Sequence, residues 1–244
     1  MTDLNLYEDD EYRAAIAELW DIAIKHNGSC PLVPWIGDIY SSEALRSGLP
    51  KVVWCGIAAD GWGDAGSVED RSIQSAAKGT RSFLLSEVDK YRFSSGFWRV
   101  LTATSAMLCG LYQSGMPPEA AVGGGMVWTN AYKVGGAPSG NPTGSLEKAQ
   151  REASAVALRR EIACLQPRIT VFHTGDSANG VMNIWPGWEH WTKHSQWCWS
   201  RSKGGMLEIW LSRSRALSVN RAVDEVRWAV IDWLREAGRE TLTP

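Results

Sequence analysis

Residues Lys51–Asp64, which read KVVWCGIAADGWGD, combine a short apolar run with an abrupt turn. The run, Val52–Ile57, gives way to small residues, an acid and glycines before Trp62. An apolar stretch of this length that ends at turn residues predicts a buried strand. In open α/β sheets, ligands bind at the carboxyl ends of the strands. We therefore expect a functional site where other strands end beside this turn.

Three further runs have the composition of strands, and segments with helical periodicity separate them. The expected strands, in addition to Lys51–Ile57, are Met126–Tyr132, Arg168–His173 and Met206–Leu211. The expected helices are Asp9–His26, a short one at Ser42–Ser47, Phe97–Gln113, Leu146–Leu165 with Ser145 as its N-cap, and Asn220–Glu236. Strands that alternate with helices predict a parallel sheet with right-handed crossovers. The predicted fold class is therefore α/β.

Two stretches do not fit this alternation. Ala65–Thr80 is rich in glycine, serine and charged residues and shows no clear period, which predicts a long functional loop. Several of the 14 tryptophans fall within residues 185–210. Their rings either build an irregular core or form an aromatic surface on which a base or a sugar stacks.

The composition is that of one domain without a strong net charge. The 244 residues suffice for a single α/β domain, with residues 1–50 as a helical extension and residues 51–237 as the core. Lys and Arg number 25 against 27 Asp and Glu, so contacts with nucleic acid would depend on local patches. The five cysteines form no CxxC pair, and we expect free thiols in a reducing cytoplasm with neither metal nor cofactor. No signal pattern or membrane-length apolar run occurs, so we expect a cytoplasmic protein with no membrane contact.

The predicted strand ends collect polar residues at one edge of the sheet. They supply the amide of Asn130, the carboxylates of Asp60 and Asp176, the imidazole of His173, and the cations Arg213 and Arg215. Ser177 lies in a Gly-Asp-Ser triplet of the kind that opens one esterase family, but here the triplet follows the third strand and no histidine lies beyond His194. Neither GxxxxGK(S/T) nor GxGxxG occurs, which argues against a phosphate loop or a dinucleotide site.

Four segments, taken in order, resemble motifs of the uracil-DNA glycosylase superfamily. Thr129–Val134 followed by Pro138–Asn141 resembles the TN-x-x-K…P-x-G-N signature of its bacterial iron–sulfur branch. Phe172–Ala178 is similar to the strand that ends in a Gly-Ser-Tyr-Ala-like turn. Arg213–Arg221 is similar to the HPSPLS-x-x-R segment near the carboxyl end of the family, and Gly56–Trp62 stands where its water-activating motif falls.

This resemblance spans Lys51 to about Leu234 and implies a three-layer α/β/α fold. It implies a central four-stranded parallel sheet, DNA as the partner, and a pocket in which a flipped base loses its N-glycosidic bond. The Asn130 amide matches the group that reads the base edge, since an amide offers both a donor and an acceptor. The alternative is that Asn130 only caps the strand end. Arg213 stands where the family has a histidine and either stabilises the departing base or holds a phosphate.

The remaining expected contacts follow from the same resemblance. The residues expected to border the base are Ala58, Ala59, Trp62 and His173. The residues expected to contact the DNA backbone are Lys133, Ser214, Arg215 and Arg221. For each of these cations alone, a solvated surface position explains the sequence equally well.

The first motif departs from the family pattern. The family's acid or amide aligns with Ile57 or Ala58, so the nearest carboxylate is Asp60, which would stabilise the sugar cation or orient water. In the best-known branch of the family, a tyrosine near this position forms one wall of the base pocket and excludes bulkier pyrimidines. In this sequence, Ala58, Ala59 and Gly61 would leave that wall nearly without side chains. The resemblance with this departure favours a modified pyrimidine, such as the hydroxymethylated or glucosylated cytosine of phage DNA, and a role in antiviral defence.

Two alternatives to this activity stay open at the level of sequence. One is a uracil-DNA glycosylase of base-excision repair. The other is a catalytically silent protein that binds a nucleotide or a modified base, which the missing acid and histidine support. No feature of the sequence indicates an obligate protein partner.

Overall fold

A computed structural model gives the structure of the protein. It describes residues 6–34, 50–58, 63–89, 96–112, 126–136, 140–175, 190–212 and 217–236, and of residues 84–89 the backbone alone. The short helix expected at Ser42–Ser47 lies outside these ranges.

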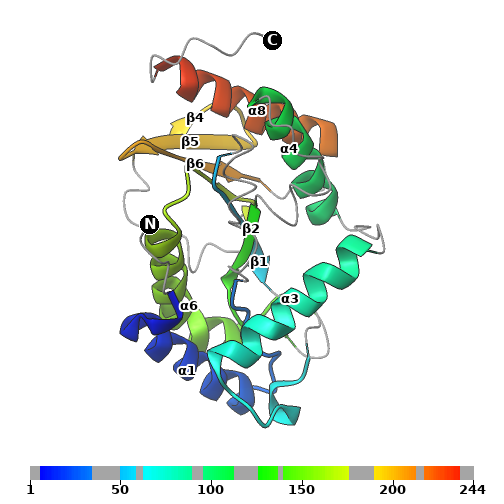
Figure 1. The fold of residues 1–244 in the computed structure, drawn as a ribbon, viewed down its shortest axis with the longest axis vertical. Coiled ribbons are helices and arrows are strands. Elements are labelled where there is room, and N and C mark those ends of the chain that lie inside the picture. Colours follow the sequence, from blue (N-terminus) through cyan, green and yellow to red (C-terminus); the bar gives the residue numbers. More distant parts are fainter. Residues whose placement is uncertain are drawn as a thin grey trace.

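A mixed sheet of six strands forms the centre of the described part of the chain (Figure 1). Its strands are β1 (Val52–Ala58), β2 (Met126–Tyr132), β3 (Ile169–Phe172), β4 (Thr192–Lys193), β5 (Cys198–Lys203) and β6 (Met206–Leu211). Their order is β2-β1-β3-β6-β5-β4. The first four are parallel neighbours, whereas β5 is antiparallel to β6 and β4 to β5. The α/β class is therefore confirmed, with an antiparallel extension that the sequence did not indicate.

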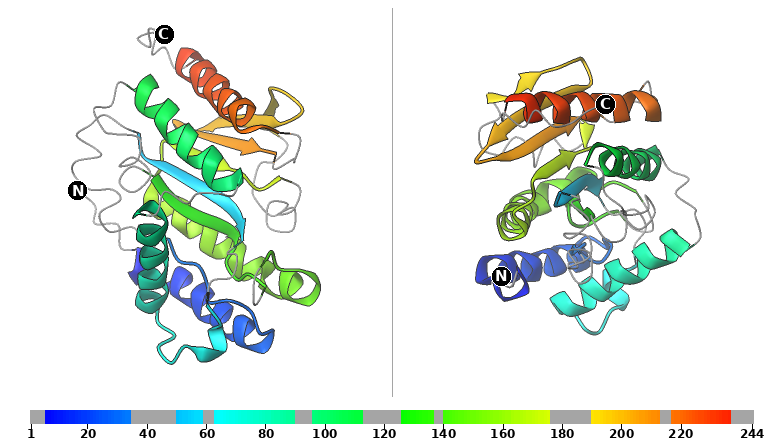
Figure 2. Two further views of the ribbon diagram at one scale, coloured as in Figure 1. Left: turned by 90° about the vertical axis from the view of Figure 1, so that its right-hand side faces the viewer. Right: turned by 45° about the horizontal axis from the view of Figure 1, so that its top comes forward.

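Helices cover both faces of the sheet (Figures 1 and 2). They are α1 (Asp10–Lys25), α3 (Ile73–Asp89), α4 (Gly96–Leu111), α6 (Gly144–Leu165) and α8 (Val219–Glu236), with single 3-10 turns at Leu6–Glu8 and Ala65–Ser67. Helices α4 and α8 pack on one face and α6 on the other. Helix α1 packs on the outer side of α6, and α3 joins the same buried cluster. The amino-terminal helix thus shares a core with the helix that backs the sheet.

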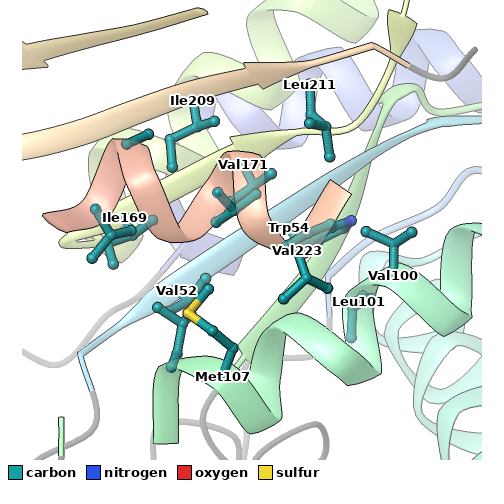
Figure 3. Close-up of a cluster of buried hydrophobic side chains, with 14 of the residues drawn as sticks. Val52, Trp54, Val100, Leu101, Met107, Ile169, Val171, Ile209, Leu211 and Val223 are labelled. Carbon is teal, nitrogen blue, oxygen red and sulfur yellow. The ribbon is translucent and has the colours of Figure 1, made fainter. Parts of the chain in front are cut away.

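The strands alternate between the two faces, as their period of two residues requires. Val52 and Trp54 of β1 point toward α4 and α8, where they meet Val100 and Val223 (Figure 3). Cys55 and its neighbours in the opposite phase instead contact α6. Both faces are apolar, which is the pattern expected of a parallel strand covered by helices on each side.

The expectation of one long loop over Ala65–Thr80 is wrong, because a 3-10 turn occupies Ala65–Ser67 and the helix α3 begins at Ile73. Ile73, Ala76 and Ala77 lie on one buried face of that helix, and the Thr80 hydroxyl donates to the Val33 carbonyl at 2.6 Å. The apolar face is short and made largely of alanine, so its period is weak in the sequence.

The tryptophan-rich segment is also more regular than expected. Its described part includes β4 and β5, and Trp199 of β5 lies opposite Trp210 of β6 with ring centroids 4.5 Å apart. Trp210 is buried, whereas Trp191 and Trp199 are half-buried against the α6 side of the sheet. A core function is therefore confirmed for Trp210 within a regular strand. Trp185 and Trp188 lie outside the described residues.

Helix α6 begins earlier than expected. Thr143 is its N-cap residue and makes no side-chain capping bond, so Ser145 lies inside the first turn and is not the cap. The Ser145 hydroxyl instead lies 3.4 Å from Nδ1 of His26, at the end of α1. At the other end, Gln166 closes the helix in the left-handed region with φ of 45°.

No helix in the described ranges is long and apolar enough to span a membrane.

Candidate functional site

The carboxyl ends of the parallel strands bring together several of the residues expected at the site. In the register of the sheet, Gly56 lies opposite Asn130 and Ala58 lies opposite Tyr132. His173 directly follows β3, and its backbone N–H donates to the Cys55 carbonyl at 2.9 Å. The strand pairing therefore places Asn130 and His173 on the two sides of β1, at the same edge of the sheet.

The Asn130 amide has a fixed orientation. Its Oδ1 accepts a hydrogen bond from Nε1 of Trp128 at 3.1 Å. Because an indole N–H can only donate, this contact decides which end of the amide is the oxygen. The Nδ2 group is buried and has no acceptor among the described residues. Buried polar groups are hydrogen-bonded in nearly all structures, so this donor is suited to a ligand.

Gly56 lets the strand β1 approach that amide. A Cβ atom at this position would lie 2.4 Å from Oδ1 of Asn130 and 3.0 Å from the ring of Phe97. The Phe97 ring also stacks on His173 with centroids 5.6 Å apart and an interplanar angle of 17°. Trp54 meets the same imidazole edge-on at 5.9 Å. We call Gly56, Phe97, Trp128, Asn130 and His173 the rim cluster.

The rim cluster is closed in this structure. Asn130 is 1% exposed and His173 is 4% exposed. One face of the imidazole is covered by Phe97, so His173 has at most one face for a base. A ligand would therefore reach the amide only if part of the surrounding structure moved.

Lys133 does not fit the expected contact with the DNA backbone. Its side chain is fully buried, and its Nζ lies 2.6 Å from Oε2 of Glu161. The same ammonium group donates to the Thr129 hydroxyl at 2.6 Å, and that hydroxyl donates to Glu161 at 2.6 Å. An external phosphate cannot contact an ammonium group enclosed in this way. The expectation for Lys133 is thus corrected to a structural role.

Tyr12 of α1 completes this buried network. Its hydroxyl donates to Oε1 of Glu161 at 3.0 Å. Burial raises the pKa of the Tyr12 phenol well above its ordinary value, and the neighbouring Glu161 charge raises this pKa further. The phenol therefore stays protonated and remains a donor. Glu161 thus accepts bonds from three residues, and we call Tyr12, Thr129, Lys133 and Glu161 the anchor network.

The segment that follows β2 is held by side chains of other elements. The Gln150 amide of α6 both accepts from the Val134 N–H at 2.9 Å and donates to the Val134 carbonyl at 2.7 Å. The Ser29 hydroxyl accepts from the Gly135 N–H at 2.8 Å. The part of the P-x-G-N segment that is described starts at Gly140, whose φ of 109° lies in the region that favours glycine. The chain leaving Asn130 is therefore fixed on the α6 side.

The other expected residues divide into two groups. Ala58 is the last residue of β1 and is half-buried. Arg221 lies in the first turn of α8, where it pairs with Glu225 at 2.8 Å and stacks 4.8 Å from the Trp228 ring centre. The residues outside the described ranges are Ala59, Asp60, Trp62, Asp176, Arg213, Ser214 and Arg215. The roles of these residues stay predictions from the sequence.

Asp64, which follows the first motif, has a structural role. Asp64 is the N-cap of the 3-10 turn at Ala65–Ser67, and its Oδ1 accepts from the Gly66 N–H at 3.0 Å. Within the described ranges, no group of three or more His, Cys, Asp or Glu side chains is placed to hold a metal ion. Nε2 of His194 lies 2.5 Å from the Ser200 hydroxyl of β5.

A cavity of about 460 Å³ lies next to the rim cluster, between α1 and α3. Phe83 lines this cavity and also contacts the Trp128 ring, with centroids 5.6 Å apart. The residues that α3 contributes recur at helical spacing and are mostly small: Ser75, Ala76, Gly79, Ser82 and Phe83. Trp20 and Cys30 line the opposite side, and the Trp20 indole N–H has no acceptor among the described residues. Burial raises the pKa of the Cys30 thiol, so this group is neutral there.

No family model matches the chain, and no curated protein is significantly similar to it. The resemblance to the glycosylase superfamily therefore depends on the motifs and on their placement. Sequence reasoning found Asn130 and His173 but not Trp128, Phe97 or Glu161. Trp128 could have been found, since it lies two residues before Asn130 and hence on the same face of the strand.

Replacing Glu161 with glutamine should destabilise the fold strongly. The change leaves the Lys133 ammonium buried without a counter-charge, and breaking a buried ion pair in this way costs about 3–5 kcal/mol. Urea unfolding measures the loss. The matched control is Glu152→Gln on the exposed face of the same helix, which should change stability by less than about 0.5 kcal/mol. Equal effects of the two variants would show that the anchor network does not support the fold.

Replacing Gly56 with alanine should destabilise the rim cluster. The added methyl group would meet the Asn130 oxygen and the Phe97 ring, and overpacking of this kind costs about 1–3 kcal/mol. The control is Gly110→Ala on α4, where no atom lies within 4 Å of the new Cβ and helix propensity improves. We expect opposite signs in the free energies of unfolding. A neutral Gly56→Ala would contradict the close approach of β1 to the amide.

Proposed function

We propose that this protein is a DNA glycosylase that hydrolyses the N-glycosidic bond of a flipped, modified pyrimidine and leaves an abasic site. The observation that carries the proposal is the Asn130 amide, with Oδ1 held by Trp128 and Nδ2 buried without an acceptor in the described structure. A pyrimidine edge presents a donor beside an acceptor and can complete both ends of such an amide.

The arrangement of the sheet also supports the proposal. Four adjacent strands are parallel, which agrees with the fold that the resemblance implies. The motif Thr129–Lys133 forms the carboxyl end of the strand β2 and the residue directly after it. Within the motif, Asn130 faces away from the anchor network. This is the edge at which ligands bind in open α/β sheets.

The chemistry assigned to the remaining groups rests on the sequence. Breaking the bond leaves positive charge on the sugar and negative charge on the departing base, so an anion and a cation are needed at opposite ends. Asp60 is proposed to stabilise the sugar cation or to orient water. Arg213 is proposed to stabilise the departing base. In the sequence, both follow described strand ends within two residues, because β1 ends at Ala58 and β6 ends at Leu211.

A bulky substituent on the base is favoured by the cavity beside the rim cluster. The small residues of α3 leave about 460 Å³ open, and the wall contains hydroxyl groups and the Trp20 N–H. Such donors and acceptors suit a hydroxyl-rich group better than a plain hydrocarbon. We therefore propose hydroxymethylated or glucosylated cytosine of phage DNA as the substrate, and antiviral defence as the role. Uracil in base-excision repair would leave this cavity unused.

A catalytically silent binding protein is the second candidate. It is favoured by the end of β1, where Gly56, Ile57 and Ala58 supply no acid. The closed rim cluster would then sense a base rather than cleave its bond. The two candidates differ in one measurable product, because only the glycosylase leaves an abasic site.

Incubation with DNA that contains uracil, hydroxymethylcytosine or glucosylated hydroxymethylcytosine, followed by alkali, should give strand breaks on a modified cytosine. Removing one charge-stabilising group typically costs about 10²–10³-fold in rate, so we expect this loss in Asp60→Asn. The Asn130→Ala variant should also release the base slowly, because the base edge loses its hydrogen-bonding partner. The control is Asp64→Asn, since asparagine caps a turn equally well.

The outcomes separate the candidates. Breaks on any of the three DNAs would exclude the silent protein. Binding without breaks would exclude the glycosylase, and breaks on uracil alone would indicate base-excision repair. If Asp60→Asn keeps full base release, then another group supplies the anion.

Filling the cavity should alter the choice of base. Gly79→Trp places a ring at a helical position with open space around its Cβ, so the fold should tolerate it. We expect base release from glucosylated DNA to fall about 10-fold or more relative to hydroxymethylated DNA, because the larger group loses its space. Gly79→Ala is the control, since it adds little volume. An equal loss on both DNAs would show that the substituent lies elsewhere.

A further inference from the structure

A second cavity, of about 560 Å³, lies at the opposite edge of the sheet. It is lined by the end of α6, by the residues that lead into β3, and by the hairpin between β5 and β6. Arg168 precedes β3 and His173 follows it, so the strand separates this cavity from the rim cluster by roughly 16 Å. This distance places it outside the proposed DNA-binding edge.

Cationic side chains dominate the lining of this cavity. They are Arg159, Arg168, Arg201 and Lys203, and Glu208 is the one carboxylate among the described lining residues. Arg201 and Glu208 form a buried ion pair with each other, so their charges cancel. For Arg159, Arg168 and Lys203 there is no carboxylate within ion-pair distance in the described structure. Three positive charges therefore border the cavity without a balancing acid among the residues that the structure describes.

Two of the guanidinium groups are held in place by aromatic rings. Arg168 lies 5.2 Å from the centre of the Trp233 ring, and Arg201 lies 5.1 Å from that of Trp191. Arg201 is also only 8% exposed. Because Arg201 is already paired with Glu208, Arg168 is the ring-oriented guanidinium left for an anion. An oriented guanidinium loses less freedom when it binds an anion, and its planar fork matches the oxygens of a phosphate.

The lining also has an apolar part. Ile162, Pro167 and Met206 contribute it, next to the cations. The carbonyl end of α6 borders the cavity and carries a partial negative charge, but this is about half a unit and fades within one turn. It does not offset three full positive charges. The volume lies within the range of small-molecule sites, and such sites pair an apolar wall with a few charged groups.

We propose that this cavity binds a small phosphate ester with at least two negative charges. Its phosphate groups contact Arg159, Arg168 and Lys203, and its carbon part rests on Ile162, Pro167 and Met206. The site is independent of the glycosylase proposal, because it shares no residue with the rim cluster. A DNA strand fits less well, since a continuous strand needs a basic surface that extends beyond one cavity.

Isothermal titration of the full-length protein with ADP and with inorganic pyrophosphate tests the proposal. We expect saturable binding of both, with ADP tighter, and weaker binding at high salt. Arg159→Gln and Arg168→Gln should each reduce the affinity for ADP about 10-fold, since each removes a charge-assisted contact. The matched control is Arg227→Gln on α8, an exposed arginine that pairs with Asp224 and lies outside the cavity.

Several results would overturn the proposal. No saturable binding of either probe at millimolar concentration would exclude the site, as would unchanged affinity in the two arginine variants. Equal affinity for ADP and pyrophosphate would exclude a role for the apolar wall. Displacement of ADP by a short oligonucleotide that loses affinity in the same variants would assign the cavity to nucleic acid instead. Arg159 is half-buried on a helix, so its variant should fold even if Arg168→Gln does not. Neither loss would alter base release, which keeps this test separate from that of the glycosylase.

Discussion

The buried ion pair between Lys133 and Glu161 is the constraint on which the arrangement of the site depends. Two full charges with no solvent exposure carry a large desolvation cost, and their attraction offsets it only when the other lone pairs and protons are also satisfied. Here Thr129 bridges the pair, and the Tyr12 hydroxyl donates a hydrogen bond to the second carboxylate oxygen. The network joins α1, β2 and α6 at one point. Any shift of β2 relative to α6 would break these hydrogen bonds inside the protein, where water cannot replace them. The network therefore fixes the position of the carboxyl end of β2.

This fixed position explains how one short motif serves both the fold and the site. Thr129 and Asn130 are adjacent in β2 and therefore point to opposite faces of the sheet. Thr129 enters the anchor network on the α6 side, while Asn130 is presented on the side of α4, where Trp128 orients its amide. Gly56 on the neighbouring strand leaves the space that the amide oxygen occupies. The threonine and lysine of the motif thus hold the strand, and the Nδ2 group of the asparagine is left without an acceptor among the described residues.

Sequence patterns predicted the parts of the molecule whose signal is local. Apolar runs bounded by turn residues gave β1, β2 and β6 closely, because their side chains are buried on both faces. The helix α3 was not found, since Gly79 and flanking charges obscure an apolar face that consists mostly of alanine. Likewise β5 reads CWSRSK, in which serine and basic residues follow Trp199 instead of an apolar run. At the candidate site, the strand pattern placed Asn130 near the carboxyl end of β2, as the structure has it, while its role at the base came from the family resemblance. Glu161 was not found, because a charge in mid-helix is typical of a solvated face, and only the tertiary fold brings it to Lys133.

The orientation of the amide also limits what it can contribute to recognition. With Oδ1 turned to Trp128, the amide still has one free lone pair and the two protons of Nδ2. Under the proposed function, uracil would meet these with N3–H and a carbonyl, and cytosine with its amino group and N3, so the amide would not discriminate between the two bases. A mismatched edge that leaves Nδ2 unpaired would cost about 1–3 kcal/mol, which is roughly one to two powers of ten in affinity. Discrimination beyond this must come from shape. Under the proposed function, that shape would come from the cavity lined by small residues of α3, whose Phe83 contacts the Trp128 ring of the rim cluster.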